Sequence, residues 1–215
     1  MPEPAPAISA VVFDFGQVLI DWDPRHLYRT LLDDDTAVEA FLAEVCTMEW
    51  HAQHDAGRPF AETIPQLCTD HPEHAELIQA WSERYIDMIL GPMPGMVEVV
   101  SELADADVAL YGLTNMPAEV WDPLHERFPF FHRLHDTIVS GREGVVKPDP
   151  KIFEILVDRF GLDPPRTVFI DDIELNVAAA RAAGLNAIRF VGADKLRRDL
   201  AAMGLPLAST VTRPR

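Results

Sequence analysis

Short apolar runs alternate with helical patterns along most of this sequence, and this alternation restricts the possible fold more than any other feature. The runs are apolar at consecutive positions, which is typical of strands buried on both faces. They occupy residues 8–15, 108–113, 137–139, 167–170 and 186–191. Strands that alternate with helices form a parallel sheet with helices on both faces. The sequence therefore predicts an α/β fold.

Three helical patterns between these runs have their own start and stop signals. The first follows Gly95, and the third spans residues 175–183. The second can begin after Asp149, because aspartate is a good N-cap, with Pro150 at the first helical position. Gly161 then ends it, since glycine adopts the left-handed conformation that follows many helices. These patterns predict helices that connect the parallel strands.

Residues 23–90 interrupt this rhythm, because they carry several helical patterns and no convincing strand. The last and longest pattern runs from residue 75 to residue 89, and a stretch rich in proline and glycine closes the segment at 91–95. We expect a helical cap over residues 22–92. The core domain would then consist of residues 1–21 and 93–215.

Charge and cysteine content exclude several classes of protein. The 215 residues are 48% hydrophobic and include 18 Lys and Arg against 35 Asp and Glu, a formal net charge of −17. Such an acidic chain is not expected to bind a nucleic-acid backbone or an anionic membrane, because both partners are also negatively charged. The two cysteines cannot form a disulfide framework, which indicates a reduced compartment.

We expect neither a membrane span nor a secretory signal in this sequence. Its apolar runs are far shorter than the roughly 20 residues of a membrane span. Residues 1–6 have neither the basic nor the apolar part of a secretory signal. We therefore expect a cytoplasmic protein that binds neither membrane nor nucleic acid, and both a monomer and a homodimer remain open.

Polar side chains stand where three of the predicted strands end. Asp14 ends the first strand, Thr114 and Asn115 follow the second, and Asp171 and Asp172 follow the run at 167–170. Open parallel sheets bind their ligands beyond the carboxyl ends of the strands. We therefore expect these side chains to line one site.

The chemistry of this set suits phosphoryl transfer. Carboxylate oxygens are preferred ligands of Mg²⁺. Lys147, in the loop before the helix predicted at 150–160, adds an ammonium group that can neutralise phosphate charge, and the Thr114 hydroxyl can donate a hydrogen bond. A carboxylate such as Asp14 can attack phosphorus and form an aspartyl-phosphate.

These residues belong to four motifs that resemble those of the haloacid dehalogenase-like (HAD) superfamily, in the same order. A helical insert between the first and second motifs resembles the type-1 cap of that superfamily, and the resemblance covers nearly the whole chain. The motifs are VVFDFGQVL (11–19), LTN (113–115), KPDP (147–150) and FIDD (169–172), with Asn176 further along. The resemblance implies a HAD-like Rossmannoid core with an inserted α-helical cap.

The resemblance also implies a metal site. Asp14 would be both the nucleophile and an Mg²⁺ ligand. The backbone carbonyl of Gly16 and the carboxylate of Asp172 would be further ligands, and Asp171 would bind a metal-bound water.

The remaining motif residues would contact the substrate. Thr114 and Lys147 would hold the phosphoryl group, and Asn115 would line the site. The activity implied is that of a Mg²⁺-dependent phosphatase, which hydrolyses a small phosphorylated metabolite through an aspartyl-phosphate on Asp14.

Gly16 departs from the usual pattern of HAD phosphatases. They carry a second aspartate two residues after the nucleophile as general acid and base, and such a group is typically worth about 10²- to 10⁴-fold in rate. The Asp-x-Gly stretch resembles a branch that acts on sugar phosphates such as glucose 1-phosphate. Asp21, Asp23, a cap residue or water remain open as the proton donor.

Two other functions remain open. A 2-haloacid dehalogenase would use Asp14 to attack carbon without a metal, but its fourth motif lacks an acidic pair such as Asp171 and Asp172. A catalytically poor HAD-fold protein that binds phosphorylated ligands or a partner would explain the missing second aspartate.

The polar segment 49–58 lies between two predicted cap helices, in a region that often faces the active site in this family. His51, His54 and Arg58 are therefore candidates for substrate selection. His51 and His54 could share a helix face and suggest a metal pair, but no known zinc motif surrounds them. We expect these histidines to be solvated.

Overall fold

The computed structural model describes residues 7–207, so residues 1–6, for which no secretory signal is predicted, lie outside it. Its centre is a parallel sheet of five strands in the order β5-β4-β1-β6-β7. All five predicted strands are confirmed, and none of their ends lies more than about two residues from the predicted one. They are β1 (Ala10–Phe13), β4 (Ala109–Thr114), β5 (Asp136–Val139), β6 (Thr167–Asp171) and β7 (Asn186–Arg189).

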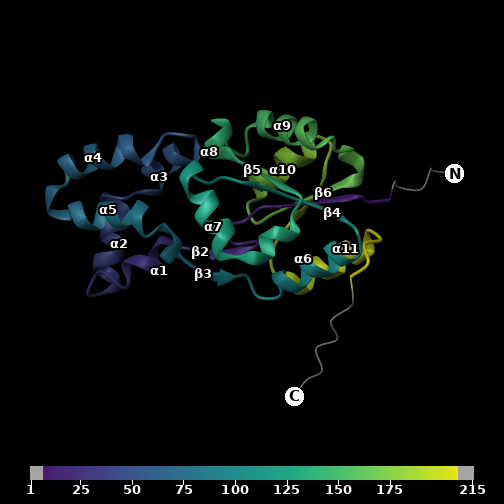
Figure 1. Ribbon diagram of the computed structural model, residues 1–215, viewed down its shortest axis with the longest axis horizontal. Coiled ribbons are helices and arrows are strands. Elements are labelled where there is room, and N and C mark those ends of the chain that lie inside the picture. The colour runs from purple at the N-terminus through teal and green to yellow at the C-terminus, as the bar shows by residue number, and fades with distance from the viewer. Residues whose placement is uncertain (1–6, 208–215) are drawn as a thin grey trace, which may run out of the picture.

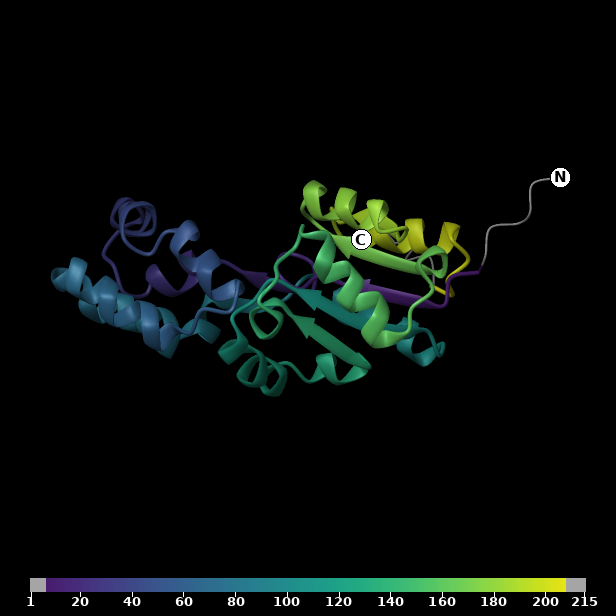
Figure 2. The same ribbon diagram turned by 90° about the horizontal axis from the view of Figure 1, so that it is seen from above.

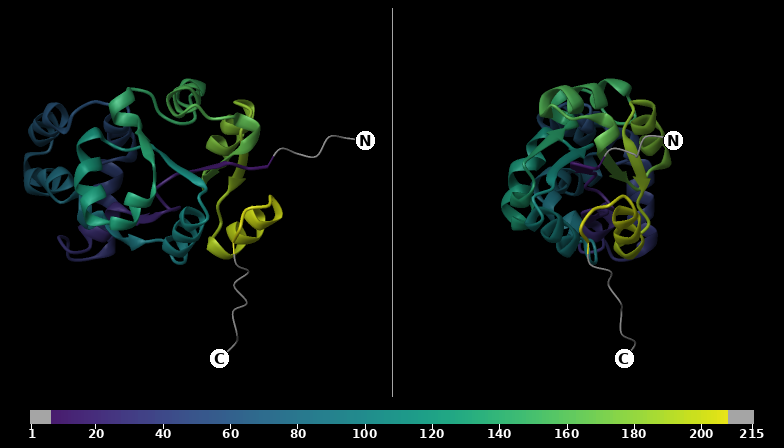
Figure 3. Two further views of the ribbon diagram at one scale, coloured as in Figure 1. Left: turned by 45° about the vertical axis from the view of Figure 1, so that its right-hand side comes forward. Right: turned by 90° about the vertical axis from the view of Figure 1, so that its right-hand side faces the viewer.

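Successive residues of β1 face opposite sides of the sheet, and this alternation divides the core into two layers. Val11 and Phe13 pack in one cluster with apolar residues of α6 (Met96–Asp105) and α11 (Ala193–Ala202). Val12 packs in the other with α9 (Pro150–Phe160) and α10 (Glu174–Ala182). Helices therefore cover both faces of the sheet, as expected of this α/β fold (Figure 1 and Figure 3).

The start and stop signals of the connecting helices act as the sequence predicts. The Asp149 carboxylate caps α9 by accepting a hydrogen bond from the Lys151 N–H at 2.8 Å, and Pro150 is the first helical residue. Gly161 ends α9 with a φ of 60°, and Gly95 precedes α6 with a φ of 79°. At both glycines the positive φ is a conformation that other residues adopt only at a cost.

The segment between β1 and α6 forms a separate group of helices beyond one end of the sheet. The strand arrows point toward this group, so it faces the carboxyl ends of the strands (Figure 2). Trp81 and Tyr28 are fully buried within it, and the Tyr28 hydroxyl donates to the carbonyl of Leu77 at 2.9 Å. Its helices are α1 (Pro24–Tyr28), α2 (Asp35–Glu44), α3 (Met48–Asp55), α4 (Phe60–Asp70) and α5 (Ala75–Glu83), with a 3₁₀ turn at Pro72–His74.

Two short strands at the base of this group correct the sequence prediction. β2 (Ile20–Trp22) pairs with β3 (Ile89–Pro92) in an antiparallel ladder. The helix expected up to Ile89 ends at Glu83 instead, and a 3₁₀ turn at Tyr85–Met88 leads into β3. The helical spacing of apolar residues continues past Glu83, but Ile89 pairs with Trp22, a partner distant in sequence. Periodicity alone does not reveal such pairing.

The remaining helices and 3₁₀ turns surround the sheet, and no pattern in the sequence predicted them. Among the described residues, none of the helices combines the length and apolar character needed to cross a bilayer. Cys46 and Cys68 are both free thiols. The remaining elements are α7 (Trp121–Arg127), α8 (Ser140–Glu143) and the 3₁₀ turns Ala118–Val120, Pro129–Arg133 and Pro164–Arg166.

Candidate active site

Strand register brings the predicted site residues to one edge of the sheet. Phe13, the last residue of β1, pairs with Gly112 of β4 on one side and Ile170 of β6 on the other. The next residue, Asp14, donates its N–H to the carbonyl of Ile170 at 2.8 Å. Asp14 therefore lies between the ends of β4 and β6, which carry Thr114 and Asp171.

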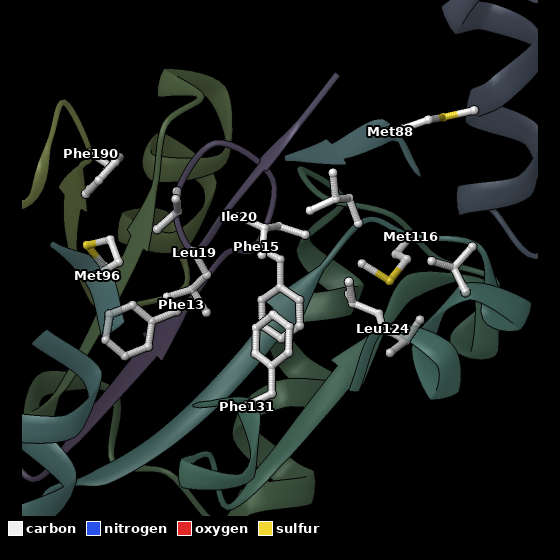
Figure 4. Packing of buried hydrophobic residues seen from close by; sticks show 14 of the residues in the cluster. Phe13, Phe15, Leu19, Ile20, Met88, Met96, Met116, Leu124, Phe131 and Phe190 are labelled. Atoms are coloured by element: carbon white, nitrogen blue, oxygen red, sulfur yellow. The ribbon is translucent and has the colours of Figure 1, made fainter. Parts of the chain in front are cut away.

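Packing beneath Asp14 fixes the backbone of this loop. Phe15 is fully buried, and its ring stacks on Phe131 with 4.6 Å between centroids (Figure 4). Its N–H donates to the Asp14 carboxylate at 2.7 Å. Gly112 lies so close that a Cβ there would come within 2.7 Å of the Phe15 ring. Close packing therefore holds the carboxylate in place.

Lys147 joins the first and third of these strand ends. Its ammonium group lies 2.7 Å from Asp14 Oδ1 and 2.8 Å from Asp171 Oδ2, and it donates to the carbonyl of Leu113 at 3.0 Å. The side chain is almost completely buried. Burial opposes the charge, but the two carboxylates outweigh it and raise the pKa of Lys147. The lysine therefore stays positively charged beside Asp14.

Asn115 positions this lysine. Its Oδ1 accepts from the Lys147 backbone N–H at 2.8 Å, and its Nδ2 donates to the Lys147 carbonyl at 3.0 Å. Two hydrogen bonds from one amide fix the loop that carries Lys147 relative to β4. Asn115 also lines the cavity described below.

Three carboxylates form a cluster that fits a divalent cation. Asp14, Asp171 and Asp172 each offer an oxygen, and these oxygens lie within 4.8 Å of one another. Asn176 Nδ2 donates to both oxygens of Asp171 at 3.0 Å, which fixes the orientation of that carboxylate. A set of hard oxygen ligands of this kind suits Mg²⁺.

The negative charge of these three carboxylates exceeds the positive charge of Lys147, which favours binding of a cation. Burial raises the pKa of Asp14 to about 7, against the opposing effect of Lys147. Burial, followed by the charge of Asp171, also raises the pKa of Asp172. One lysine thus offsets only part of the cost of burying these acids together.

A cavity of about 90 Å³ lies between this edge of the sheet and the helices of the 22–92 segment. Gly16, Thr114 and Asn115 form part of its wall on the sheet side. Other hollows lie on the surface, such as a groove between α9 and α10, away from these carboxylates. Five side chains line the cavity from the other side: Trp22, Met48, His51, Asp55 and Tyr85.

His51 and His54 are buried, so the expectation that they are solvated is wrong. His51 stacks on Trp22 with 5.3 Å between centroids, and His54 Nε2 lies 2.6 Å from the Thr63 hydroxyl. Burial lowers the pKa of His51 to about 3, so this imidazole is neutral at pH 7. Aromatic packing inside the helical segment, which the local sequence does not reveal, removes both rings from water.

Arg58 does not reach the cavity. Gly57, which precedes it, has a φ of 97°. The Arg58 guanidinium donates to Gln53 Oε1 at 2.6 Å and lies 3.6 Å from Glu62 on the exposed surface. Arg58 therefore does not line the site.

Asp55 was not among the residues predicted for the site, yet it lines the cavity. It is the last residue of α3, four positions after His51, whose Nε2 lies 3.5 Å from Asp55 Oδ1. Residues four apart share one face of a helix. The i,i+4 spacing from His51 was therefore the signal that could have identified Asp55.

A model of the haloacid dehalogenase-like hydrolase family matches residues 8–184. The chain belongs to this family. Its fold agrees with that of a HAD family enzyme from Bacteroides thetaiotaomicron, solved in complex with magnesium and inorganic phosphate. The TM-score is 0.69 at 21% identity, over 85% of this chain and 94% of the other. L-2-haloacid dehalogenase from Xanthobacter autotrophicus has a TM-score of 0.61 at 17% identity, over 92% and 84%.

Curated relatives of this HAD protein include several phosphatases. The sesquiterpene phosphatase astK of Aspergillus oryzae is 28% identical over 82% of this chain and 87% of its own length. The glyceraldehyde 3-phosphate phosphatase of Methanopyrus kandleri is 24% identical over 85% and 83%. Flavin mononucleotide hydrolase 1 of Arabidopsis thaliana is 32% identical over 53% of this chain, which spans only 46% of that protein.

Proposed function

We propose that this HAD hydrolase is a Mg²⁺-dependent phosphatase of a small phosphorylated metabolite. The observation that carries the proposal is the buried cluster in which Lys147 lies 2.7 Å from Asp14 and 2.8 Å from Asp171, with Asp172 alongside. Dehalogenation needs a carboxylate nucleophile but no acidic pair for a metal. The three acids therefore favour phosphate chemistry over the dehalogenase alternative.

Each residue of the cluster has a part in the proposed reaction. The Asp14 carboxylate attacks phosphorus and forms an aspartyl-phosphate, which water then hydrolyses. The Lys147 ammonium and the Thr114 hydroxyl bind the phosphoryl oxygens, and Asn115 keeps Lys147 in position. Phe15 and the packing beneath it hold Asp14 so that it need not reorganise during attack.

Asp14 and Asp172, with the backbone carbonyl of Gly16, would hold the magnesium ion, and Asp171 would orient a water bound to it. When bound, the ion supplies positive charge that offsets the negative charge of the phosphate and of these acids. This role is supported by the raised pKa values of Asp14 and Asp172, because both carboxylates are costly to bury ionised.

The residues that line the cavity favour a substrate whose alcohol part carries no further charge. Trp22, Met48, His51 and Tyr85 are uncharged at neutral pH, and Asp55 is acidic. Within the described residues, the cavity lining includes no Lys or Arg. A second anionic group on the substrate would therefore find no cation on this side of the site.

We propose that residues 22–92 act as a cap that opens to admit the substrate and closes to exclude water. A cavity of about 90 Å³ leaves little space beside a phosphoryl group, so substrate entry requires such movement. We further propose that the protein works in the cytoplasm on small molecules, as a monomer or homodimer, without nucleic-acid or membrane partners.

Hydrolysis of p-nitrophenyl phosphate tests the proposal. Turnover should require Mg²⁺, stop with EDTA, and be abolished in Asp14→Asn, while Asp33→Asn, an exposed change in the cap segment, keeps full activity. Mg²⁺ alone should also raise the melting temperature of the wild type, and much less that of Asp172→Asn.

Three outcomes would oppose the proposal. Substantial residual activity in Asp14→Asn would remove the nucleophile from the mechanism. Metal-independent release of chloride from 2-chloropropionate would favour the dehalogenase. Melting shifts with phosphorylated ligands, but without any turnover, would favour a binding protein.

A further inference from the structure

A phosphatase with glycine at position 16 needs a proton donor from elsewhere. The departing alcohol oxygen takes up a proton as its bond to phosphorus breaks, and a positioned acid accelerates this step by about 10²- to 10⁴-fold. Gly16 has no side chain to donate a proton. The space beside it is open, since no atom lies within 4 Å of the place where its Cβ would stand. The cavity beside Gly16 is therefore the place to look for a substitute.

Two nearby aspartates that follow the nucleophile in sequence are engaged elsewhere. Asp21 Oδ1 lies 3.2 Å from His26 Nε2. Asp23 caps α1 by accepting the Arg25 N–H at 2.9 Å. The cavity lining includes neither of them.

Asp55 differs from both because its carboxylate has an unused oxygen inside the cavity wall. Its side chain is only 16% exposed, and Oδ1 is shielded from solvent. Within residues 7–207 this oxygen has no hydrogen-bond partner, since His51 Nε2 is 3.5 Å away. A buried polar atom without a partner is costly, which points to a group that the protein lacks here.

The backbone of Asp55 is fixed to the core domain. Its carbonyl accepts a hydrogen bond from the Ser140 hydroxyl at 2.6 Å, and the same hydroxyl oxygen accepts the Met116 N–H at 3.0 Å. Met116 follows Thr114 by two residues and lines the same cavity. One hydroxyl thus ties the end of α3 to the loop that carries the phosphate-binding threonine.

We propose that Asp55 is the general acid and base of the phosphatase reaction. It would replace the second aspartate that most HAD phosphatases carry at the position of Gly16. This inference rests on the proposed function. A side chain of the cap, rather than of the nucleophile loop, would then supply the proton, so the acid would reach the substrate only when the cap is closed.

The proton balance of both steps is complete with Asp55. In the first step an oxygen of Asp14 bonds to phosphorus, the ester P–O bond breaks, and the alcohol oxygen takes the proton of the Asp55 carboxyl. In the second step water attacks phosphorus and gives a proton to the Asp55 carboxylate. The Asp14–phosphorus bond breaks, and inorganic phosphate leaves with Asp14 ionised and Asp55 protonated again.

Among the titratable groups at this part of the cavity, Asp55 is the best suited to act as general acid and base. Burial raises the pKa of Asp55 to about 7, with Lys147 opposing and Asp14 supporting the rise. The pKa of His51 is lowered to about 3, and that of Tyr85 is raised well above its ordinary value, both mainly by burial. Of these groups, Asp55 can both give and take a proton near pH 7.

A pair of aromatic phosphate esters tests the proposal. Nitrophenolate leaves p-nitrophenyl phosphate without a proton, whereas the alkoxide of benzyl phosphate needs one. In Asp55→Asn we expect kcat/KM for benzyl phosphate to fall by about 10²- to 10⁴-fold and that for p-nitrophenyl phosphate to fall much less. Glu49→Gln, an exposed change on the same helix, should leave both values as they are.

The ratio of the two kcat/KM values is independent of how much enzyme is folded, so misfolding of the variant cannot imitate the expected result. Equal losses for both esters in Asp55→Asn would overturn the proposal. A wild type that hydrolyses p-nitrophenyl phosphate but not benzyl phosphate would also overturn it, because such an enzyme lacks a general acid. Either result leaves the phosphatase assignment intact, whereas activity in Asp14→Asn would refute that assignment itself.

Discussion

Asp55 should cost the protein stability at neutral pH, and Asp55→Asn should recover it. Burial raises the pKa of this carboxyl from 3.8 to about 7 in the folded state. The folded protein therefore retains a proton that the unfolded chain has lost, which favours folding at low pH. This contribution is complete below about pH 4 and is lost as the pH rises to about 7. Asparagine has nearly the same shape and does not titrate.

The size of the effect follows from the two pKa values. The difference between 3.8 and about 7 corresponds to at most about 4 kcal/mol, at about 1.4 kcal/mol for each tenfold change in proton affinity. Between about pH 5 and pH 8 the variant should gain about 3 kcal/mol over the wild type. Urea unfolding in EDTA measures this gain, since the other carboxylates are common to both proteins and largely cancel in the difference.

A difference in unfolding free energy that stays constant from about pH 5 to pH 8 would refute this reasoning, because the Asp55 pKa would then be equal in both states. The new amide group can shift the unfolding free energy of the variant by a constant amount at every pH. Such a shift does not affect the test, since the prediction concerns how the difference changes with pH. The expected result would mean that this acid is retained at a cost in stability, as is common for groups that serve a reaction.

Two further substitutions test how the site is built. Lys147→Met leaves Asp14 and Asp171 buried without their cation, so it should lower the unfolding free energy by about 3–5 kcal/mol at pH 7. Urea titration should show a smaller loss at low pH, and an equal loss at every pH would contradict the ion-pair explanation. Gly112→Ala brings a Cβ within 2.6 Å of the Thr137 hydroxyl and 2.7 Å of the Phe15 ring. It should cost about 1–3 kcal/mol and reduce turnover, because Phe15 holds Asp14; full activity would show that this packing is dispensable.

The sheet and most of its connecting helices could be predicted because their signals are local. Each strand lies in or overlaps a largely apolar run, and α9 has its capping aspartate immediately before it and its terminal glycine immediately after it. β2 and β3 could not be predicted in this way, since Ile89 forms a strand only by pairing with Trp22, which lies far away in sequence.

Most candidate site residues were also accessible from the sequence. Parallel strands end at one edge, so Asp14, Thr114 and Asp171 had to come together once the strands were recognised. The tertiary structure alone decided what faces them across the cavity. Arg58 turns to the surface while His51 and Asp55 turn inward, because α3 packs its buried face against Trp22 and the core domain. The sequence thus determined which carboxylate, the proposed nucleophile Asp14, stands at the strand ends with Lys147, whereas long-range packing determined that Asp55 is the cap carboxylate that faces them.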